Sequence, residues 1–212
     1  MSTRNKPEDA ISSFFDRESQ SMAQRHEKKG IPPSARFHVK AISKRGASTA
    51  VDVGSGPGSI AIELLKAGVQ KVLGIDLSPQ MTKYAEKRLK EQGFSPSQFQ
   101  FRIGNFLEFQ SDEKIDAVSV HRVMCCHPEA TKIAEKCTEL NPKVVANTIP
   151  RDWKFLRLLL APIGWIAEKK GSFRPYVHSQ EQIDEIFKKK GYYLKERHRS
   201  MFWVTSIYEK ED

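Results

Sequence analysis

The sequence predicts an α/β fold in which a doubly wound, mostly parallel sheet follows an N-terminal helical arm and ends in an antiparallel C-terminal hairpin. Three observations support this prediction. Short β-branched segments alternate with amphipathic helical segments through the middle of the chain, which is typical of a parallel sheet covered on both faces. A glycine-rich turn over residues 54–58 joins one of these strands to a helix. Near the C-terminus, only a short polar link separates two strand segments, which predicts the hairpin.

The N-terminal arm covers residues 1–46 and contains two predicted helices. Apolar side chains recur on one face from Pro7 to about Lys29, and Gly30 ends this helix. After two prolines, a second helix is predicted from Ser34 to Arg45. The arm either packs against the sheet or forms a lid over a ligand site.

The core, residues 48–147, alternates strands with helices. Apolar, β-branched runs mark the strands, whereas glycines and prolines mark the helix ends. The predicted strands are 50–53, 71–75, 98–103, 115–120 and 143–147, and the predicted helices are 59–65, 79–92 and 128–140.

Simple alternation stops after the core. Residues 148–178 form a predicted lid or substrate segment, whose bulky apolar run is Trp153–Ala167. This run either lines the pocket of an apolar substrate, contacts a second subunit or lies on a membrane surface. We favour the pocket wall, because the run follows a strand at the edge where doubly wound sheets bind ligands. The last part, 179–212, comprises a helix over 179–190 that Ser179 caps, then strands 192–197 and 202–208.

Size and composition suit one globular domain over residues 1–212, with 39% hydrophobic and 29% charged residues. No apolar run approaches the roughly 18 residues that a membrane span needs, and the first ten residues lack the apolar stretch of a signal peptide. We therefore expect a cytoplasmic protein. Cys125, Cys126 and Cys137 lack the paired spacing of a metal site, so we expect reduced thiols and no bound metal.

The chain is basic, with 35 Lys and Arg against 26 Asp and Glu and a formal net charge of +9. Such a charge can attract nucleic acid, anionic lipid or an acidic small molecule. The lysine clusters at 28–29, 169–170 and 188–190 each precede a glycine, where lysine complements the C-terminal end of a helix. Nucleic-acid binding is therefore compatible with the charge but not favoured, and peripheral membrane contact stays open.

The glycine turn predicts a nucleotide-sized site, and two kinds of cofactor compete for it. A nicotinamide or flavin dinucleotide needs G-x-G-x-x-G, but the third glycine of that spacing is Ser59 here. Asp52, just before the turn, would repel a pyrophosphate and suits a ligand with a cationic ammonium group, such as S-adenosylmethionine. Asp76, at the end of the next strand, is placed to accept hydrogen bonds from ribose hydroxyls.

Four segments in order, VDVGSGPG, VLGIDLSPQM, FRIGNF and KIDAVSVHRVMCCHPEA, resemble the motif set of class I S-adenosylmethionine-dependent methyltransferases. The resemblance covers residues 48–147 and implies a Rossmann-like, seven-stranded sheet whose last strand is antiparallel. It also implies which residues hold the cofactor. The methionine end would be held by Asp52, Gly54, Ser55, Gly56 and Gly58, the ribose by Asp76, and the adenine by Leu77, Met81, Asn105 and Phe106, with His121 and Arg122 facing the reaction centre.

Two residues depart from the family pattern. Asn105 stands where many members have an aspartate, and His121 stands where many have an acid at the end of the fourth strand. The arm sequence SFFD and the segments HRVMCCHPE and SFRPYVHSQEQI are similar to the branch that contains magnesium-protoporphyrin O-methyltransferases and related small-molecule enzymes. That branch tends to have a tyrosine at the position of Phe14, so the resemblance does not specify a porphyrin substrate.

Four residues are candidates for a role in catalysis or substrate binding. His127 and His178 are placed to remove a proton from the acceptor, or else to make local hydrogen bonds in a loop or helix cap. Arg122 would pair with a substrate carboxylate or form a surface salt bridge, and Tyr176 would line the pocket or pack at an edge. Cys125 and Cys126 are interpreted as small buried hydrophobic residues rather than nucleophiles.

Together these features predict methyl transfer from S-adenosylmethionine to a small molecule, with oxygen as the favoured acceptor atom, by in-line displacement. The alternatives are an RNA-modifying methyltransferase, an NAD(P)-dependent oxidoreductase and a binding module without turnover. The sequence leaves the oligomeric state and the identity of the acceptor open.

Overall fold

We describe residues 7–153, 164, 167 and 173–211 of a computed structural model of the chain. Most of the predicted lid segment, including 154–163 and 165–166, lies outside these residues. The strands are β1 Thr49–Val53, β2 Lys71–Asp76, β3 Phe99–Ile103, β4 Ala117–His121, β5 Val144–Pro150, β6 Tyr192–Arg199 and β7 Trp203–Lys210. The α-helices are α1 Pro7–Lys29, α2 Pro33–Lys44, α3 Ser59–Lys66, α4 Pro79–Glu91, α5 Ala130–Glu139 and α7 Gln180–Lys189. Two 3₁₀ helices are η1 Phe106–Glu108 and η2 Met124–Cys126.

The strands form one seven-stranded sheet in the order β3-β2-β1-β4-β5-β7-β6. The first five strands are parallel, whereas β7 runs antiparallel to both β5 and β6. The predicted doubly wound sheet with an antiparallel C-terminal hairpin is therefore confirmed, and so is the seven-stranded order implied by the family resemblance. The strand order reverses between β1 and β4, where sheets of this kind bind ligands at the carboxyl ends of the strands.

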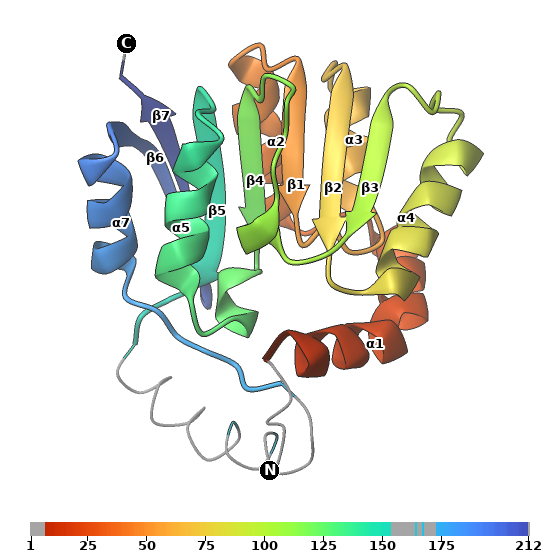
Figure 1. The fold of residues 1–212 in the computed structure, drawn as a ribbon, viewed down its shortest axis with the longest axis horizontal. Coiled ribbons are helices and arrows are strands. Elements are labelled where there is room, and N and C mark those ends of the chain that lie inside the picture. Colours follow the sequence, from red (N-terminus) through yellow and green to blue (C-terminus); the bar gives the residue numbers. More distant parts are fainter. Residues whose placement is uncertain (1–6, 154–163, 165–166, 168–172, 212) are drawn as a thin grey trace.

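Helices cover both faces of the sheet, as Figure 1 shows. One core contains Ile42 of α2, residues of α3 and Leu89 of α4, packed on alternate strand residues such as Ala50 and Val72. The other contains Ile133 of α5 and residues of α7, packed on the intervening strand residues. Because successive strand residues point to opposite faces, the continuous apolar runs of the sequence serve both cores at once.

Helix α1 extends across the carboxyl ends of the strands instead of covering a face (Figure 1). It is fixed there by polar contacts with the start of α4. Ser12 Oγ donates to the carbonyl of Leu77 at 2.8 Å, and an oxygen of Asp16 accepts from the Gln80 N–H at 3.1 Å. The arm is thus part of the ligand-binding edge of the molecule. Among the described residues, no helix combines the length and apolarity that a membrane crossing requires.

The structure differs from the sequence prediction mainly at the end of β5. The predicted strand stops at Asn147, but β5 continues to Pro150 because β7 pairs with it along its full length, up to Pro150 opposite Trp203. The prediction also missed η1 and η2, which are single 3₁₀ turns just after β3 and β4. Turns of three residues leave no periodic signal in the sequence, so their positions follow only from the folded chain.

Gly58 provides a stability test of the packing between α3 and α4. Its φ is +72°, and a Cβ placed there would lie 2.9 Å from both the Ala85 Cβ and the Leu89 Cδ1 of α4. We expect Gly58→Ala to lower the free energy of unfolding in urea by about 2–4 kcal/mol, from left-handed strain plus overpacking.

Gly46→Ala is the matched control. Its φ is +64°, but a Cβ there would meet no atom within 4 Å, so it isolates the backbone cost of roughly 1 kcal/mol. Equal losses for the two variants would contradict the proposed packing role of Gly58.

Candidate active site

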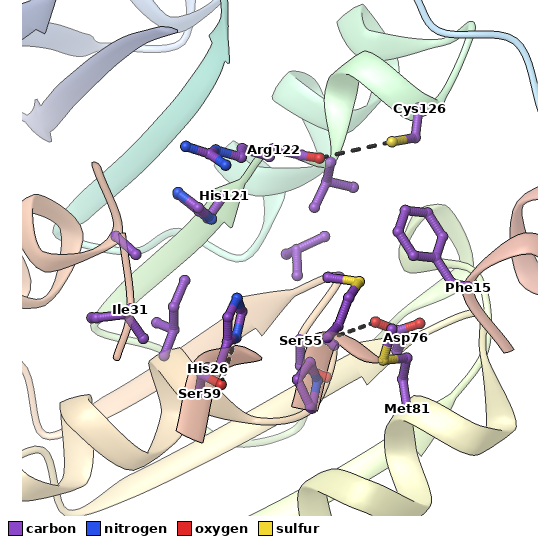
Figure 2. A pocket seen from close by; sticks show the side chains of 18 of the residues that line it. Phe15, His26, Ile31, Ser55, Ser59, Asp76, Met81, His121, Arg122 and Cys126 are labelled. Atoms are coloured by element: carbon purple, nitrogen blue, oxygen red, sulfur yellow. Dashed lines mark hydrogen bonds between the residues drawn. The ribbon is translucent and has the colours of Figure 1, made fainter. Parts of the chain in front are cut away.

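A cavity of about 650 Å³ opens at the carboxyl edge of the sheet. Its walls come from α1, α2, the glycine loop after β1, the ends of β2, β3 and β4, and Trp203 of β7. Figure 2 shows Asp76 and Met81 on one side of this space and His121 and Arg122 on the other. The predicted site residues in the lining are Gly54, Ser55, Gly56, Asp76, Leu77, Met81, Asn105, Phe106, His121, Arg122 and His127. The predicted site residues outside the lining are Asp52, Gly58, Tyr176 and His178.

The glycine loop is bound to the neighbouring strand β2. The N–H groups of Gly54 and Ser55 both donate to the carbonyl of Ile75, at 2.8 and 3.1 Å. Gly54 has a φ of +61°, and a Cβ there would lie 2.4 Å from the Val123 side chain, so no larger residue fits. At Gly56, with a φ of +51°, a Cβ would meet no atom within 4 Å. The loop backbone is thus held from behind and open toward the cavity at Gly56.

Asp76 joins the loop to the start of α4. Its two carboxylate oxygens accept from the N–H of Gly56 at 2.7 Å and from the N–H of Ser78 at 2.9 Å. Burial raises the pKa of Asp76 and the nearby Asp16 adds to this, although both N–H groups oppose it. Each carboxylate oxygen keeps a further lone pair, so Asp76 can still accept hydrogen bonds from a ligand in the cavity.

Asp52 lies on β1, fully buried behind the loop. Its Oδ2 has no hydrogen-bond partner. Burial raises its pKa to about 8, with a smaller contribution from the charge of Asp76, while the Ser119 hydroxyl opposes the shift. A buried carboxyl group without a partner is costly unless it is neutral or meets a cation. Asp52 is therefore poised to ionise when a positive group arrives.

The segment after β3 contributes the amide of Asn105 and the ring of Phe106, and α4 contributes Met81. Asn105 caps η1, accepting from the Leu107 N–H at 3.0 Å, and donates through Nδ2 to Glu8 of α1 at 3.1 Å. Met81 and Phe106 are buried beside it and line the same part of the cavity. This region provides an apolar surface with one amide at its edge, as a purine base requires.

His121 ends β4 within a chain of buried polar groups. Its Nε2 lies 2.9 Å from Ser34 Oγ of α2. Its ring packs edge-on against the ring of His38, at 5.4 Å between centroids. His38 in turn contacts the hydroxyls of Ser119 at 3.0 Å and Thr148 at 2.7 Å, which ties α2 to β4 and β5. Burial lowers the pKa of His38 to about 3 and lowers that of His121 well below its ordinary value, so both rings are neutral.

Arg122 follows β4 with an unusual backbone. Its φ is +61°, a left-handed value that few non-glycine residues adopt, and its N–H donates to the Thr148 carbonyl at 3.0 Å. The guanidinium carbon lies 4.1 Å from the centroid of the Trp203 ring, and Nη2 donates to Ser34 Oγ at 3.3 Å. The buried Nε has no partner. Strained backbone of this kind is common where a side chain must be aimed at a ligand.

The two histidine candidates occupy different positions. His127 lines the cavity, and its Nδ1 accepts from the Glu129 N–H at 3.1 Å while its Nε2 lies 3.4 Å from a carboxylate oxygen of Glu8. His178 donates through Nε2 to the carbonyls of Met124 and His127, at 2.9 and 3.0 Å, and so holds the η2 turn from outside the cavity. Both rings make local hydrogen bonds, and their predicted role in proton removal stays a prediction.

Tyr176 lies beside His178 with the two rings stacked at 5.8 Å between centroids, and its backbone N–H donates to Cys125. It thus packs behind η2. The two adjacent cysteines are only partly buried, and both line the cavity, which differs from the expectation of buried hydrophobic residues. Their sulfur atoms lie 3.8 Å apart, and Cys137 is the buried one. Among the described residues, no group of three or more His, Cys, Asp or Glu side chains is arranged to hold a metal ion.

The sequence analysis missed the cavity residues supplied by distant segments. Phe15 and His26 of α1, Ile31 before α2 and Trp203 of β7 all line the cavity. His26 Nδ1 lies 2.8 Å from Ser59 Oγ, at the first residue of α3. The helical face of α1 was visible in the sequence, but nothing local indicated that this face lies over the glycine loop.

Comparisons with known proteins agree with this geometry. A family model described as "Methyltransferase domain" matches residues 44–211. No curated protein gives a significant sequence match.

Several solved structures share the fold. The magnesium protoporphyrin IX methyltransferase of Synechocystis PCC 6803, with bound SAH, is similar over 94% of this chain and 98% of that chain, at 18% identity and a TM-score of 0.75. The N-methyltransferase NodS of Bradyrhizobium japonicum WM9, in complex with S-adenosyl-L-homocysteine, is similar over 96% and 100%, at 13% identity and a TM-score of 0.68. A 1,6-didemethyltoxoflavin-N1-methyltransferase of Burkholderia thailandensis is similar over 100% and 93%, at 11% identity and a TM-score of 0.69. At these identities the similarity shows the fold.

The buried Asp52 makes a testable prediction about pH. Its folded pKa of about 8 lies above the ordinary value, so between pH 4 and pH 8 the folded chain holds a proton that the unfolded chain has lost. This contribution to stability is present at low pH and is lost as the pH rises toward 8. We expect Asp52→Asn to remove this pH-dependent fall in the free energy of unfolding, because asparagine does not titrate. Without ligand, the free energy of unfolding of the variant relative to that of wild type should therefore rise steadily from pH 4 to pH 8, by about a few kcal/mol in total, as measured by urea unfolding.

The exposed Asp112 provides the control for this measurement. Asp112→Asn should shift the free energy of unfolding little, and by the same amount at each pH. A difference between Asp52→Asn and wild type that does not change with pH would contradict the burial argument.

Proposed function

The chain belongs to the methyltransferase domain family, and from this premise we propose that it transfers a methyl group from S-adenosylmethionine to an oxygen atom of a small molecule. The family match confirms the class of enzyme predicted from the sequence, and the oxidoreductase alternative is wrong. The observation that carries the choice of methyl donor is the buried Asp52 carboxyl, whose Oδ2 has no partner, behind an open glycine loop, with Asp76 at the next strand end.

These residues fit the donor group by group. The orphaned Asp52 Oδ2 can bind the ammonium of the methionine moiety, since burial leaves it in need of a positive charge. The space above Gly56 admits a ligand close to the backbone. Asp76 can accept from the ribose hydroxyls, while Met81 and Phe106 offer the adenine an apolar surface.

When bound, S-adenosylmethionine supplies a methyl group on a positively charged sulfur, which leaves as a neutral thioether. The protein's own part is alignment and exclusion of water. Phe15 of α1 and Phe173 stack at 5.7 Å between centroids, and Phe14 packs edge-on against Phe173 at 4.7 Å, so these rings form an apolar cover beside the cavity. His121 stays neutral and hydrogen-bonded to Ser34, so it orients the acceptor side rather than adding charge to it.

Two observations support a small acceptor with a reacting oxygen. The cavity volume of about 650 Å³ lies in the range of small-molecule sites and is enclosed by α1. An acidic oxygen is already deprotonated at neutral pH and needs no base, which suits a cavity whose histidines 26, 121 and 127 each use a ring nitrogen in a hydrogen bond within the protein. His178 then acts as a positioning residue for η2.

The direct test combines binding and turnover. Isothermal titration should show binding of S-adenosylhomocysteine and none of NADH. With a labelled methyl donor and a cell extract, label should appear in the fraction of low molecular mass. Label in an ester is released by alkali, which separates carboxylate from amine acceptors. Label confined to RNA would overturn the small-molecule assignment, and binding of NADH without S-adenosylhomocysteine would overturn the proposed donor.

The ribose contact makes a separate prediction. Asp76→Asn keeps the size of the side chain but removes its charge and one acceptor oxygen. We expect it to weaken S-adenosylhomocysteine binding by about tenfold or more, because a hydrogen bond to a charged group is worth about 1.5–3 kcal/mol. Titration calorimetry measures the change, with the exposed Asp112→Asn as the control of equal charge change. Unchanged affinity in Asp76→Asn would refute this placement of the ribose.

A further inference from the structure

Four basic side chains line the cavity. The lining includes the side chains of Arg25, Lys29, Arg36 and Arg122, whereas Asp76 is its single carboxylate among the described residues. Asp76 lies on the opposite side from Arg122 (Figure 2). Arg25 and Arg122 both contribute, after burial and Arg88, to the lowered pKa of His26, so this part of the cavity is electrostatically positive.

Arg122 is the most restrained of these cations. Its left-handed backbone is held by the hydrogen bond to the Thr148 carbonyl, and its guanidinium carbon lies 4.1 Å from the centroid of the Trp203 ring. The hydrogen bond from Nη2 to Ser34 Oγ at 3.3 Å fixes the end of the guanidinium group, whose planar set of N–H donors forms a fork. An arginine held on both sides loses little further entropy when it binds a ligand, so the group is preorganised.

Arg122 also has no carboxylate partner among the residues that the structure describes. Its buried Nε has no hydrogen-bond partner. Burial lowers the pKa of Arg122, Cys125 opposes this shift, and the charge of Arg25 adds a smaller lowering effect. A partly buried guanidinium that keeps an unused donor costs free energy, which an anionic group would recover.

Arg122 lies away from the residues that fit the methyl donor, on the side of the cavity left for the methyl acceptor. Trp203 lies opposite Pro150 of β5, so the Arg122 fork is directed toward the β5 and β7 side of β4. Asp52, Asp76 and Met81 belong to β1, β2 and α4, on the other side of the point where the strand order reverses. The site for an anion is therefore separated from the residues that fit the donor.

We propose that Arg122 binds a carboxylate of the methyl acceptor, so that the substrate class is small organic acids with an apolar body. This inference rests on the proposed function, because it assigns the remaining part of the same cavity. The planar fork matches the two oxygens of a carboxylate. Ile11, Phe15 and Ile31 supply apolar surface for the rest of the molecule.

The test compares an acid with its uncharged amide in protein saturated with S-adenosylhomocysteine. The probes are 3-phenylpropionate and 3-phenylpropionamide, titrated by calorimetry. We expect wild type to prefer the acid by about tenfold or more, as a charge-assisted hydrogen bond implies. Arg122→Gln should abolish this preference, and Arg122→Lys should keep part of it, because the charge remains and the fork is lost.

Arg102→Gln is the matched control. Arg102 also lies over an aromatic ring, Phe109, at 5.5 Å, but does not line the cavity, so its loss should leave the preference for the acid unchanged. Thermal melting identifies any variant that fails to fold, and the preference itself is a ratio that general destabilisation does not change.

Three results would overturn the proposal. They are equal binding of acid and amide to wild type, absence of binding by both, and an acid preference that survives in Arg122→Gln. A fourth concerns the source of the carboxylate, since the donor carries one of its own. If Arg122→Gln weakens S-adenosylhomocysteine tenfold but leaves 5′-methylthioadenosine unchanged, Arg122 binds the donor and the acceptor assignment is wrong. Failure of wild type to bind S-adenosylhomocysteine would instead refute the proposed function.

Discussion

The structure depends on the carboxyl group of Asp52, which the fold buries with no hydrogen-bond partner for its Oδ2. A second acid in the same sheet shows the contrast. Asp116, just before β4, accepts from the N–H groups of Ser48 and Thr49, and these bonds lower its pKa against the effect of burial. Asp52, at the opposite end of the neighbouring strand, keeps a free oxygen and a pKa raised to about 8. Backbone N–H groups satisfy Asp116, whereas one oxygen of Asp52 is buried without a hydrogen-bond partner.

The surrounding elements maintain that condition. Gly54 brings the loop against Val123, because a Cβ at this position would lie 2.4 Å from the Val123 side chain. Asp76 uses its two oxygens on the N–H groups of Gly56 and Ser78, which fixes the loop and adds negative charge close to Asp52. Asp16 of α1 increases this charge at the start of α4. The N-terminal arm therefore does more than pack against the sheet. Its side chains line part of the cavity, and its charged residues change the electrostatic potential there.

The fold could be predicted from the sequence because its signals are local. Alternating apolar segments, helix-ending glycines and the cap at Ser179 are each read within a few residues, and the helix limits deviate by one or two positions. Candidate residues for the donor side could be predicted for the same reason, since Asp52 and Asp76 lie in fixed relation to one loop, and their role in binding stays a prediction. The acceptor side could not. Trp203 and Phe15 reach the cavity from opposite ends of the chain, and the aim of Arg122 depends on a φ that no sequence pattern specifies.

The donor side and the acceptor side of the cavity carry charged groups of opposite sign. The carboxyl groups of Asp52 and Asp76 belong to β1 and β2, while Arg122 follows β4 and lies against Trp203 of β7. A positively charged donor and a negatively charged acceptor would each be drawn to its own side, with the reacting atoms meeting between them. If a methyl group moves from the sulfonium to an anionic oxygen, the charges of donor and acceptor disappear together, and exclusion of water from the cavity would favour that neutralisation. In the proposed reaction, the separation of the acidic and basic side chains would serve alignment, and an acceptor that is already anionic would need no base.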